Sequence, residues 1–205
     1  MLPTYIFDID ETLLHSSKTQ SKSPNSIAST PIRLNNNETY HVQLRPGALS
    51  LFTELFKLQD MNMLSVGIWT AAEQAYALKV LKVLLGDKVK NLKFIYTRKD
   101  CTTFLIKNTP RYFKPLSKFF GNVSNRRRVM LIDDNQDNIS LNQELGFSVM
   151  KMPPFYGSSR DHHLDKIQNA LLSLEVLKRA NRGRSPRSTT GRSPRSPVSV
   201  TAPLR

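Results

Sequence analysis

The sequence has one cysteine, no long apolar run and few acidic residues. Cys101 cannot form a disulfide within the chain, which fits a reducing compartment. We expect Cys101 to be buried, as a small hydrophobic side chain. No apolar run approaches the ~20 residues that cross a bilayer. Acids within the first ten residues argue against a secretory signal. We therefore expect an intracellular protein of the nucleus or cytoplasm that does not contact a membrane.

The shortage of acid leaves a basic chain whose charge is unevenly placed. The 205 residues include 30 Lys and Arg but only 16 Asp and Glu, a formal net charge of +14. Residues 178–205 hold eight of the basic residues and no acid, so subtracting eight leaves +6 for residues 1–177. A length of 205 residues suits one domain with a sizeable core and a tail. We expect both parts to attract polyanions.

Residues 178–205 are the predicted tail. The hexapeptide GRSPRS occurs twice, at 183–188 and 191–196, with few apolar residues around it. Such a segment cannot bury enough surface to offset the entropy cost of ordering, so we predict that it is disordered. The predicted domain is therefore residues 1–177.

Within this domain, short apolar runs alternate with segments of helical periodicity. We predict strands over 4–8, 63–70, 92–97, 128–133 and 147–152. We predict helices over 48–61, 72–85, 140–146 and 161–181. Two further runs, 32–34 and 40–44, are separated by NNNE and indicate a hairpin. Strands that alternate with helices predict an α/β fold, a doubly wound parallel sheet covered on both faces.

The predicted strands deliver polar side chains where each of them ends. The first is followed by Asp8 and Asp10, the second by Thr70, and the fourth by Asp133 and Asp134. Ligands bind beyond the carboxyl ends of strands in such sheets. Each feature alone has an ordinary explanation, since D-x-D occurs in solvated turns and the other residues can cap the helices that follow. Their joint occurrence on successive strand ends favours a functional site.

Four converging carboxylates repel one another unless a cation compensates them. Ligation by oxygen alone selects a hard ion such as Mg²⁺. The chain has no His and Cys set with zinc spacing, and His162 and His163 stand at a predicted helix start, where we expect a solvated cap region. A G-x-x-x-x-G-K-[ST] phosphate loop is also absent, which argues against a nucleoside triphosphatase of that type.

Taken together, the motifs resemble those of a known superfamily. They are DIDET with LLHSS at 8–17, LRPG at 44–47, WTA at 69–71, RKDC at 98–101, FKPLS at 113–117 and LIDDN at 131–135. In this order they resemble the haloacid dehalogenase superfamily, and within it the phosphatases that act on the C-terminal domain (CTD) of RNA polymerase II, including the small CTD phosphatases. The resemblance covers residues 4–170. It implies a Rossmann-like core with a small hairpin insert at about 18–44 and no large cap.

The resemblance also implies catalytic roles. Asp8 would be the nucleophile that forms an aspartyl-phosphate. Asp10 would protonate the leaving serine or threonine oxygen and then activate water. Thr70 and Lys114 would hold the phosphoryl oxygens, with Lys114 counted among the catalytic residues, and Arg98 would contact the substrate peptide or its phosphate. The chemistry is consistent, because phosphoryl transfer requires an in-line nucleophile and neutralised charge.

The same resemblance implies a magnesium site. Asp8, the backbone carbonyl of Asp10, and Asp134 would be its ligands, and Asp133 would support them. The expected activity is that of a Mg²⁺-dependent protein phosphatase acting on phosphoserine or phosphothreonine. The absence of a large cap favours a phosphoprotein, including Ser-Pro-rich sequences like the polymerase tail, over a small metabolite.

Two departures from the family pattern concern substrate recognition. Lys18 stands where the family usually has an aromatic residue, and Pro115 follows Lys114 where an aspartate is common. A basic residue at position 18 predicts preference for a second phosphate or an acidic flank.

Other functions stay open at the level of sequence. A nucleic-acid end phosphatase shares the chemistry and would explain the basic charge. A catalytically silent scaffold that binds phosphoproteins or nucleic acid is a second alternative, which the intact acid set disfavours. A signalling receiver domain is excluded by the order of its motifs. The tail is either a solubilising extension or an arm that contacts nucleic acid, and its Ser-Pro pairs are candidate phosphorylation sites on which the enzyme itself would act.

Overall fold

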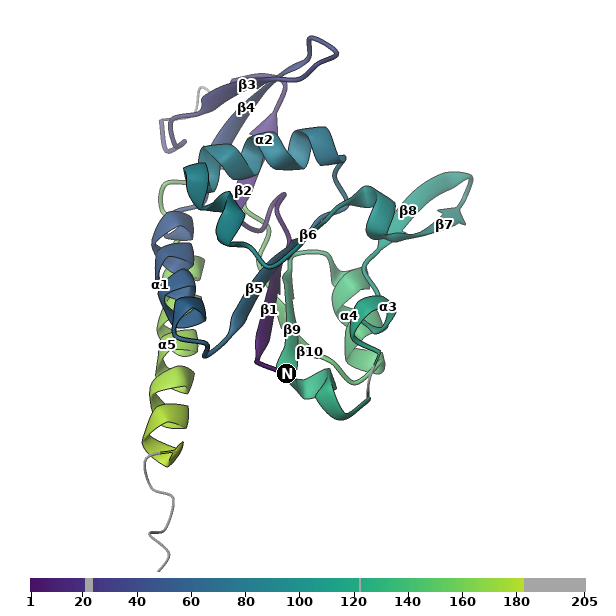
Figure 1. Cartoon of the computed structure of the whole chain (residues 1–205). Coiled ribbons are helices and arrows are strands. Elements are labelled where there is room, and N and C mark those ends of the chain that lie inside the picture. Colours follow the sequence, from purple (N-terminus) through teal and green to yellow (C-terminus); the bar gives the residue numbers. More distant parts are fainter. Residues whose placement is uncertain (21–23, 122, 183–205) are drawn as a thin grey trace, which may run out of the picture.

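A five-stranded parallel sheet forms the centre of the molecule (Figure 1). The computed structural model describes residues 1–20, 24–121 and 123–182. The strand order is β10-β9-β1-β5-β6. The strands are β1 (Thr4–Phe7), β5 (Ser65–Trp69), β6 (Ile95–Tyr96), β9 (Val129–Asp133) and β10 (Ser148–Lys151). The predicted doubly wound sheet is confirmed.

The strand order reverses between β1 and β9. From β1 the chain proceeds outward to β5 and β6, and then returns to build β9 and β10 on the other side. Phe7 pairs with Ile132 on one side and with Ile68 on the other. The residues that follow these three strands therefore meet at the point where ligands bind in open α/β sheets.

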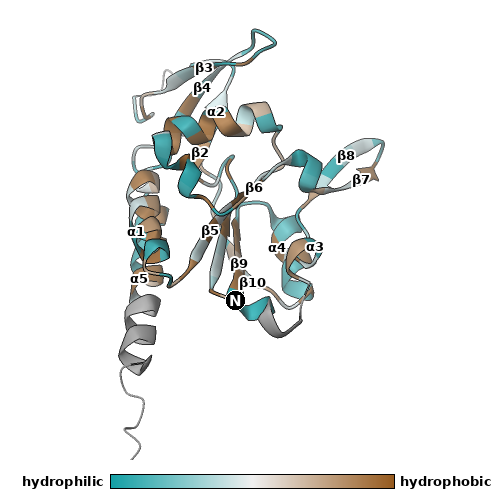
Figure 2. Cartoon of the chain, in the orientation of Figure 1, coloured by the Kyte–Doolittle hydropathy of each residue, from teal (hydrophilic) through white to brown (hydrophobic). Residues whose placement is uncertain are grey.

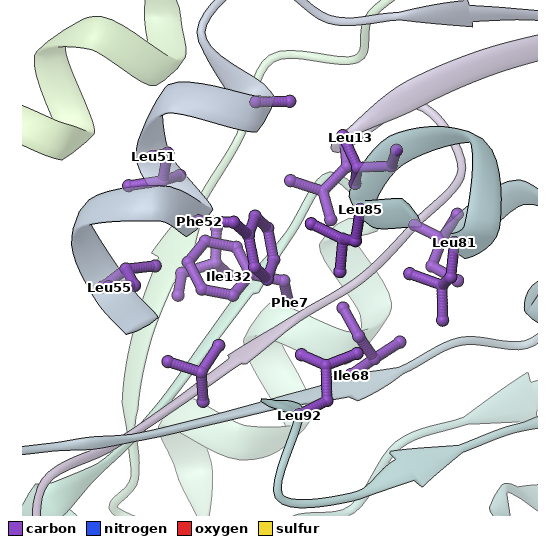
Figure 3. Close-up of a cluster of buried hydrophobic side chains, with 14 of the residues drawn as sticks. Phe7, Leu13, Leu51, Phe52, Leu55, Ile68, Leu81, Leu85, Leu92 and Ile132 are labelled. Atoms are coloured by element: carbon purple, nitrogen blue, oxygen red, sulfur yellow. The ribbon is translucent and has the colours of Figure 1, made fainter. Parts of the chain in front are cut away.

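Helices cover both faces of the sheet, because side chains along a strand alternate between the two faces. Tyr5 and Phe7 pack into a large cluster with α1 and α2, whereas Ile6 packs into a second cluster with Trp69 and Phe147. Figure 3 shows the larger cluster, in which Phe7 lies among side chains of α1 and α2. Figure 2 shows the central strands as mostly hydrophobic. The near-continuous apolar strands in the sequence reflect this burial from both sides.

The predicted helices are confirmed within a few residues. They correspond to α1 (Ala48–Asp60), α2 (Gln74–Leu85), α4 (Gln136–Glu144) and α5 (His163–Arg182). The largest difference is at α4, which begins four residues before position 140. Its N-cap is Asn135, whose side chain accepts hydrogen bonds from the backbone amides of Asp137 and Asn138. Asp133 and Asp134 therefore do not cap this helix.

The insert is a small antiparallel sheet. The predicted hairpin is present as β3 (Thr30–Arg33) and β4 (Thr39–Leu44), and β2 (Leu14–Ser17) adds a third strand that we did not predict. A second hairpin, β7 (Thr102–Ile106) and β8 (Thr109–Phe113), was also not predicted. It projects from the body of the molecule in Figure 1. A short helix, α3 (Ser117–Phe120), and three 3-10 segments complete the described elements: η1 (Gly86–Asn91), η2 (Arg98–Asp100) and η3 (Val123–Arg128).

Helix α5 continues to Arg182, so the predicted boundary after residue 177 falls within it. Residues 183–205 of the predicted tail lie outside the described residues. Among the helices in the described part of the chain, none combines the length and the apolar character that crossing a membrane requires.

Candidate active site

Three carboxylates gather where β1 and β9 end. Asp8 follows β1, and its backbone amide donates a hydrogen bond to the carbonyl of Ile132 in β9 (2.9 Å). This bond sets Asp8 beside Asp133, the last residue of β9. One carboxylate oxygen each from Asp8, Asp133 and Asp134 lie within 4.8 Å of one another. The structure thus brings together these acids of the predicted site.

A buried lysine lies between two of these acids. Lys114 is 1% exposed, and its ammonium group donates to Oδ1 of Asp8 and to Oδ2 of Asp133 (2.9 Å). Burial alone would lower the pKa of Lys114, but the carboxylates of Asp133 and Asp8 outweigh it and raise the pKa. Lys114 is therefore a fixed cation at the centre of the site.

Two asparagines of α4 hold the backbone around Lys114. Asn138 Oδ1 accepts from the Lys114 amide (3.1 Å), and its Nδ2 donates to Asp133 Oδ2 (3.1 Å). Asn142 Nδ2 donates to the Lys114 carbonyl (2.9 Å), and its Oδ1 accepts from the Leu116 amide (2.7 Å). We did not predict a role for either residue from the sequence. The signal was a pair of asparagines four apart on one helix face, which is unusual for a face that packs on a sheet.

Thr12 is a second residue to which the sequence analysis assigned no role. It is fully buried, and its hydroxyl exchanges hydrogen bonds with Asp134, accepting from the backbone amide (3.1 Å) and donating to Oδ1 (3.2 Å). Burial and the nearby Asp133 raise the pKa of Asp134. Thr12 thereby orients Asp134 toward the other acids. Its place in the DIDET motif was the available signal.

Asp10 is held from the opposite side by helix α2. The hydroxyl of Tyr76 donates to Asp10 Oδ1 (2.5 Å), and Ser16 of β2 lies 2.5 Å from the same hydroxyl. Burial raises the pKa of Asp10, although the hydrogen bond from Tyr76 and the charge of Lys114 oppose the rise. A carboxyl with a raised pKa can carry a proton and donate it, as a general acid must.

Thr70 follows directly after β5 and is 1% exposed. Its hydroxyl accepts a hydrogen bond from the amide of Ala72 (3.0 Å). Helix α2 begins only at Gln74 with Glu73 as its N-cap, so Thr70 shapes the preceding turn and is not the helix cap. It lies beside β1 because β1 and β5 pair in parallel.

Arg98 lies at the rim of the site. Its Nε donates to the carbonyl of Ala71 (2.8 Å), its Nη1 to Glu73 (2.9 Å), and its guanidinium lies over the ring of Tyr112 at 4.9 Å. These contacts fix Arg98 as part of the wall of a groove.

This groove opens from Asp10 and has a volume of about 640 Å³. Its lining comes from the DIDET loop, the insert sheet, the start of α2 and the second hairpin. The residues are Asp10, Glu11, Ser16, Leu34, Asn36, Glu38, Tyr40, Ala71, Ala72, Glu73, Tyr76, Arg98 and Tyr112.

Lys18 forms an exposed ion pair with the insert sheet. Its ammonium group lies 2.5 Å from Glu38 of the insert, and it also lies over the ring of Tyr40. Both side chains are exposed, so the pair is a weak one, and the expected preference for a second phosphate or an acidic flank stays a prediction. Pro115 leaves Lys114 in position.

Arg45, from the LRPG motif, links the site loops to the start of α5. It is 1% exposed and binds both oxygens of Asp161 (2.9 and 2.8 Å), the Thr12 carbonyl (3.0 Å) and the Pro153 carbonyl (2.9 Å). Asp161 also accepts from the amide of His163 (3.1 Å). His162 is exposed and His163 is half-buried at this helix start, and both lie outside the acid cluster. Cys101 is buried, as expected.

The donor set at the strand ends fits a hard cation. Asp8 and Asp134 supply carboxylate oxygens, the Asp10 backbone can add a carbonyl oxygen, and the cluster contains neither His nor Cys. Asp133 is occupied by Lys114, Asn138 and the Asn135 amide, so it suits a supporting role.

Comparison of the chain with protein families shows which family has these motifs. Residues 3–181 match the family of NLI interacting factor-like phosphatases. The chain belongs to this family. Its DIDET, WTA, FKPLS and LIDDN segments all fall inside the matched region and supply Asp8, Thr70, Lys114 and Asp134.

Solved structures show the same fold. The chain is similar to fission yeast RNA polymerase II CTD phosphatase Fcp1 bound to beryllium fluoride, with a TM-score of 0.55, 18% identity and coverage of 88% of this chain and 52% of that one. It is also similar to a structure of Fcp1 described as an essential RNA polymerase II CTD phosphatase, with a TM-score of 0.55, 18% identity and coverage of 92% and 55%. The chain thus spans about half the length of these structures. No curated protein matches it.

Proposed function

We propose that this protein is a Mg²⁺-dependent phosphoserine and phosphothreonine protein phosphatase that works through an aspartyl-phosphate on Asp8. The observation that carries the proposal is the contact of Lys114 with Asp8 at the carboxyl end of β1, beside Asp133 and Asp134. A nucleophilic carboxylate beside a buried cation is what transfer of a phosphoryl group requires.

In the first step an oxygen of Asp8 attacks the phosphorus, and the bond between phosphorus and the serine or threonine oxygen breaks. Asp10 gives its proton to the departing oxygen. In the second step water attacks the phosphorus, Asp10 takes a proton from that water, and the bond to Asp8 breaks to release inorganic phosphate. The raised pKa of Asp10 supports this double role.

The remaining residues stabilise charge on the phosphoryl oxygens. Lys114 contacts Asp8, and Thr70 follows β5, which pairs with β1; both side chains would donate to these oxygens. Arg98, at the groove rim, would contact the substrate peptide. Asp8, Asp134 and the carbonyl of Asp10 would hold Mg²⁺, and Asp133 would support them. When bound, the ion supplies positive charge that lets a carboxylate approach a phosphate dianion.

A phosphoprotein is the substrate class that the groove supports. The groove reaches from Asp10 between the insert sheet and the second hairpin, and the described residues include no large cap over it. Its carboxylates disfavour a nucleic-acid end, whose backbone they would repel. A Ser-Pro-rich substrate like the polymerase tail remains a prediction. Contact of residues 178–205 with nucleic acid also remains a prediction, as does residence of the protein in the nucleus or cytoplasm.

Hydrolysis of p-nitrophenyl phosphate tests the proposal. The wild type should release nitrophenol with Mg²⁺ and stop in EDTA, and Asp8→Asn should be inactive with Mg²⁺ because it lacks the nucleophile. Denaturation curves would show that the variant is folded. If the folded wild type showed no turnover, the proposed phosphatase activity would be wrong, and a phosphoprotein-binding scaffold would be favoured.

A further inference from the structure

The groove beside Asp10 is acidic in a chain that is strongly basic. Four of the chain's 16 acidic residues line it: Asp10, Glu11, Glu38 and Glu73. Arg98 is the single Lys or Arg in this lining. The excess of carboxylates extends outward from the position where a phosphoserine would react, so it faces the residues that flank that serine.

The rim carboxylates are available to an incoming cation. Glu38 and Glu73 have side chains that are 37% and 72% exposed, and their partners Lys18 and Arg98 are also exposed. Ion pairs of this kind are weak and exchange readily with other charges. Glu11, deeper in the groove, accepts a hydrogen bond from His15 but has no Lys or Arg partner among the ion pairs of the described residues.

The chain itself contains a segment of complementary chemistry. In residues 183–197, Ser185 and Ser193 each have arginine immediately before them and proline and arginine immediately after. A phosphoserine in this setting presents one dianion between two guanidinium groups. The dianion suits the acid site next to Asp10, where Lys114 contacts Asp8, and the guanidinium groups match the carboxylates of the rim.

We propose that the groove binds the arginine-flanked phosphoserines of residues 183–197, with phosphoserine 185 delivered by a second copy of this chain, and that the protein removes their phosphates. This inference rests on the proposed phosphatase function and adds the substrate to it. The atoms balance as in the two steps above: the serine oxygen keeps the proton from Asp10, and water supplies the oxygen of the released phosphate.

For Ser185, delivery from a second copy follows from the direction of α5. This helix begins next to Asp161, which Arg45 ties to the site loops, and it runs back along the sheet to end at the opposite side (Figure 1). Its 20 residues span ~30 Å. Ser185 stands three residues beyond the helix end and can reach only ~10 Å from it. It therefore cannot return to the groove of its own chain.

The first test compares two synthetic phosphopeptides on the full-length protein. One carries residues 181–190 with phosphate on Ser185, and the other is the same peptide with Arg184→Gln and Arg187→Gln. We expect the ratio of their kcat/KM values to favour the arginine peptide by roughly 2- to 30-fold, since two exposed ion pairs contribute that much. Added salt should reduce the ratio.

Variants of the rim carboxylates test whether these residues cause the preference for the arginine peptide. In a Glu38→Gln, Glu73→Gln double variant the ratio should fall to about 1, because neither arginine then has a carboxylate partner on the rim. Asp87→Asn is the matched control, because it removes an exposed carboxylate from outside the groove and should leave the ratio unchanged. Because the readout is a ratio within one variant, a general change in activity cancels.

The second test uses a full-length Asp8→Asn protein that carries phosphoserine at 185, 193 and 196, prepared by semisynthesis. Wild-type enzyme should remove these phosphates, as followed by mass spectrometry, at a rate proportional to the concentration of both proteins. Intact phosphates would overturn the assignment of the tail as the occupant, even if basic peptides are preferred.

The outcomes separate the two proposals. Equal hydrolysis of both peptides would overturn the acidic-groove inference and leave the phosphatase in place. Failure on both peptides and on p-nitrophenyl phosphate would overturn the proposed function itself.

Discussion

The ammonium nitrogen of Lys114 lies 2.9 Å from Oδ2 of Asp133 and also donates to Asp8, so one buried cation joins the ends of two neighbouring strands. The three side chains are almost inaccessible to water. Buried charges of this kind are tolerated only as a set, because each one alone would carry the full cost of desolvation.

Replacement of Lys114 by Met should therefore affect both stability and catalysis. It leaves two buried carboxylates without their cation, so we expect a loss of about 3–5 kcal/mol in the free energy of unfolding. The loss of a charged donor to the phosphoryl group should lower kcat by roughly 100-fold or more. Urea denaturation and p-nitrophenyl phosphate kinetics measure the two effects. Lys118→Met, an exposed lysine on α3, is the control, and equal stability of both variants would contradict the prediction.

The contact between Tyr76 and Asp10 predicts a dependence on the leaving group. Tyr76→Phe removes the hydrogen bond that orients the proposed general acid. Hydrolysis of a phosphoserine peptide should fall by about 10-fold, whereas p-nitrophenyl phosphate, whose leaving group needs little proton donation, should change less. Equal losses on the two substrates would contradict a role in orienting the acid.

The same variant should move the alkaline side of the pH–rate profile. Asp10 must be protonated to act as an acid, so activity falls as the pH rises through its pKa. The Tyr76 hydrogen bond lowers that pKa, and its removal should shift the fall to higher pH. Profiles of kcat/KM for wild type and Tyr76→Phe measure the shift, and a shift to lower pH would contradict the assignment.

Asp161 should contribute stability that acid removes. The hydrogen bonds from Arg45 outweigh burial and lower the pKa of Asp161 to about 2. Because this folded value lies below the ~3.9 of an unfolded aspartate, the contribution is fully present above that value and is lost as the pH falls through about 2. Its size is about 2 kcal/mol. Denaturation of wild type and Asp161→Asn at pH 6 and pH 3 should show the difference between them shrinking at the lower pH.

Asn142 should be a structural residue of the site. Asn142→Ala removes the partners of the Lys114 carbonyl and the Leu116 amide in a buried setting, which should cost about 2–4 kcal/mol. Gln143→Ala, on the exposed face of the same helix, should change stability by less than about 0.5 kcal/mol. Thermal unfolding of the two variants compares them, and similar melting temperatures would show that these hydrogen bonds contribute little.

Much of the fold could be predicted because its signals are local. Strands buried on both faces read as continuous apolar runs, and α1 and α2 show helical periodicity within their own residues. The hairpin of β7 and β8 was not predicted, because its sequence lacks the pattern by which strands are recognised. Phe104, Leu105 and Ile106 are exposed on it, so its sequence lacks the alternation of a half-buried strand.

By itself the sequence determined that acids follow the first and fourth predicted strands, because the order of residues along the chain decides what stands at each strand end. Only the tertiary structure decided which charges are buried and paired. Lys114 reaches Asp8 across more than a hundred residues, and Lys18 meets Glu38 of the turn between β3 and β4. The groove likewise became acidic only when Glu38 and Glu73 were brought to its rim from separate elements. Burial and Coulomb interactions depend on distance in space, which local sequence patterns do not encode.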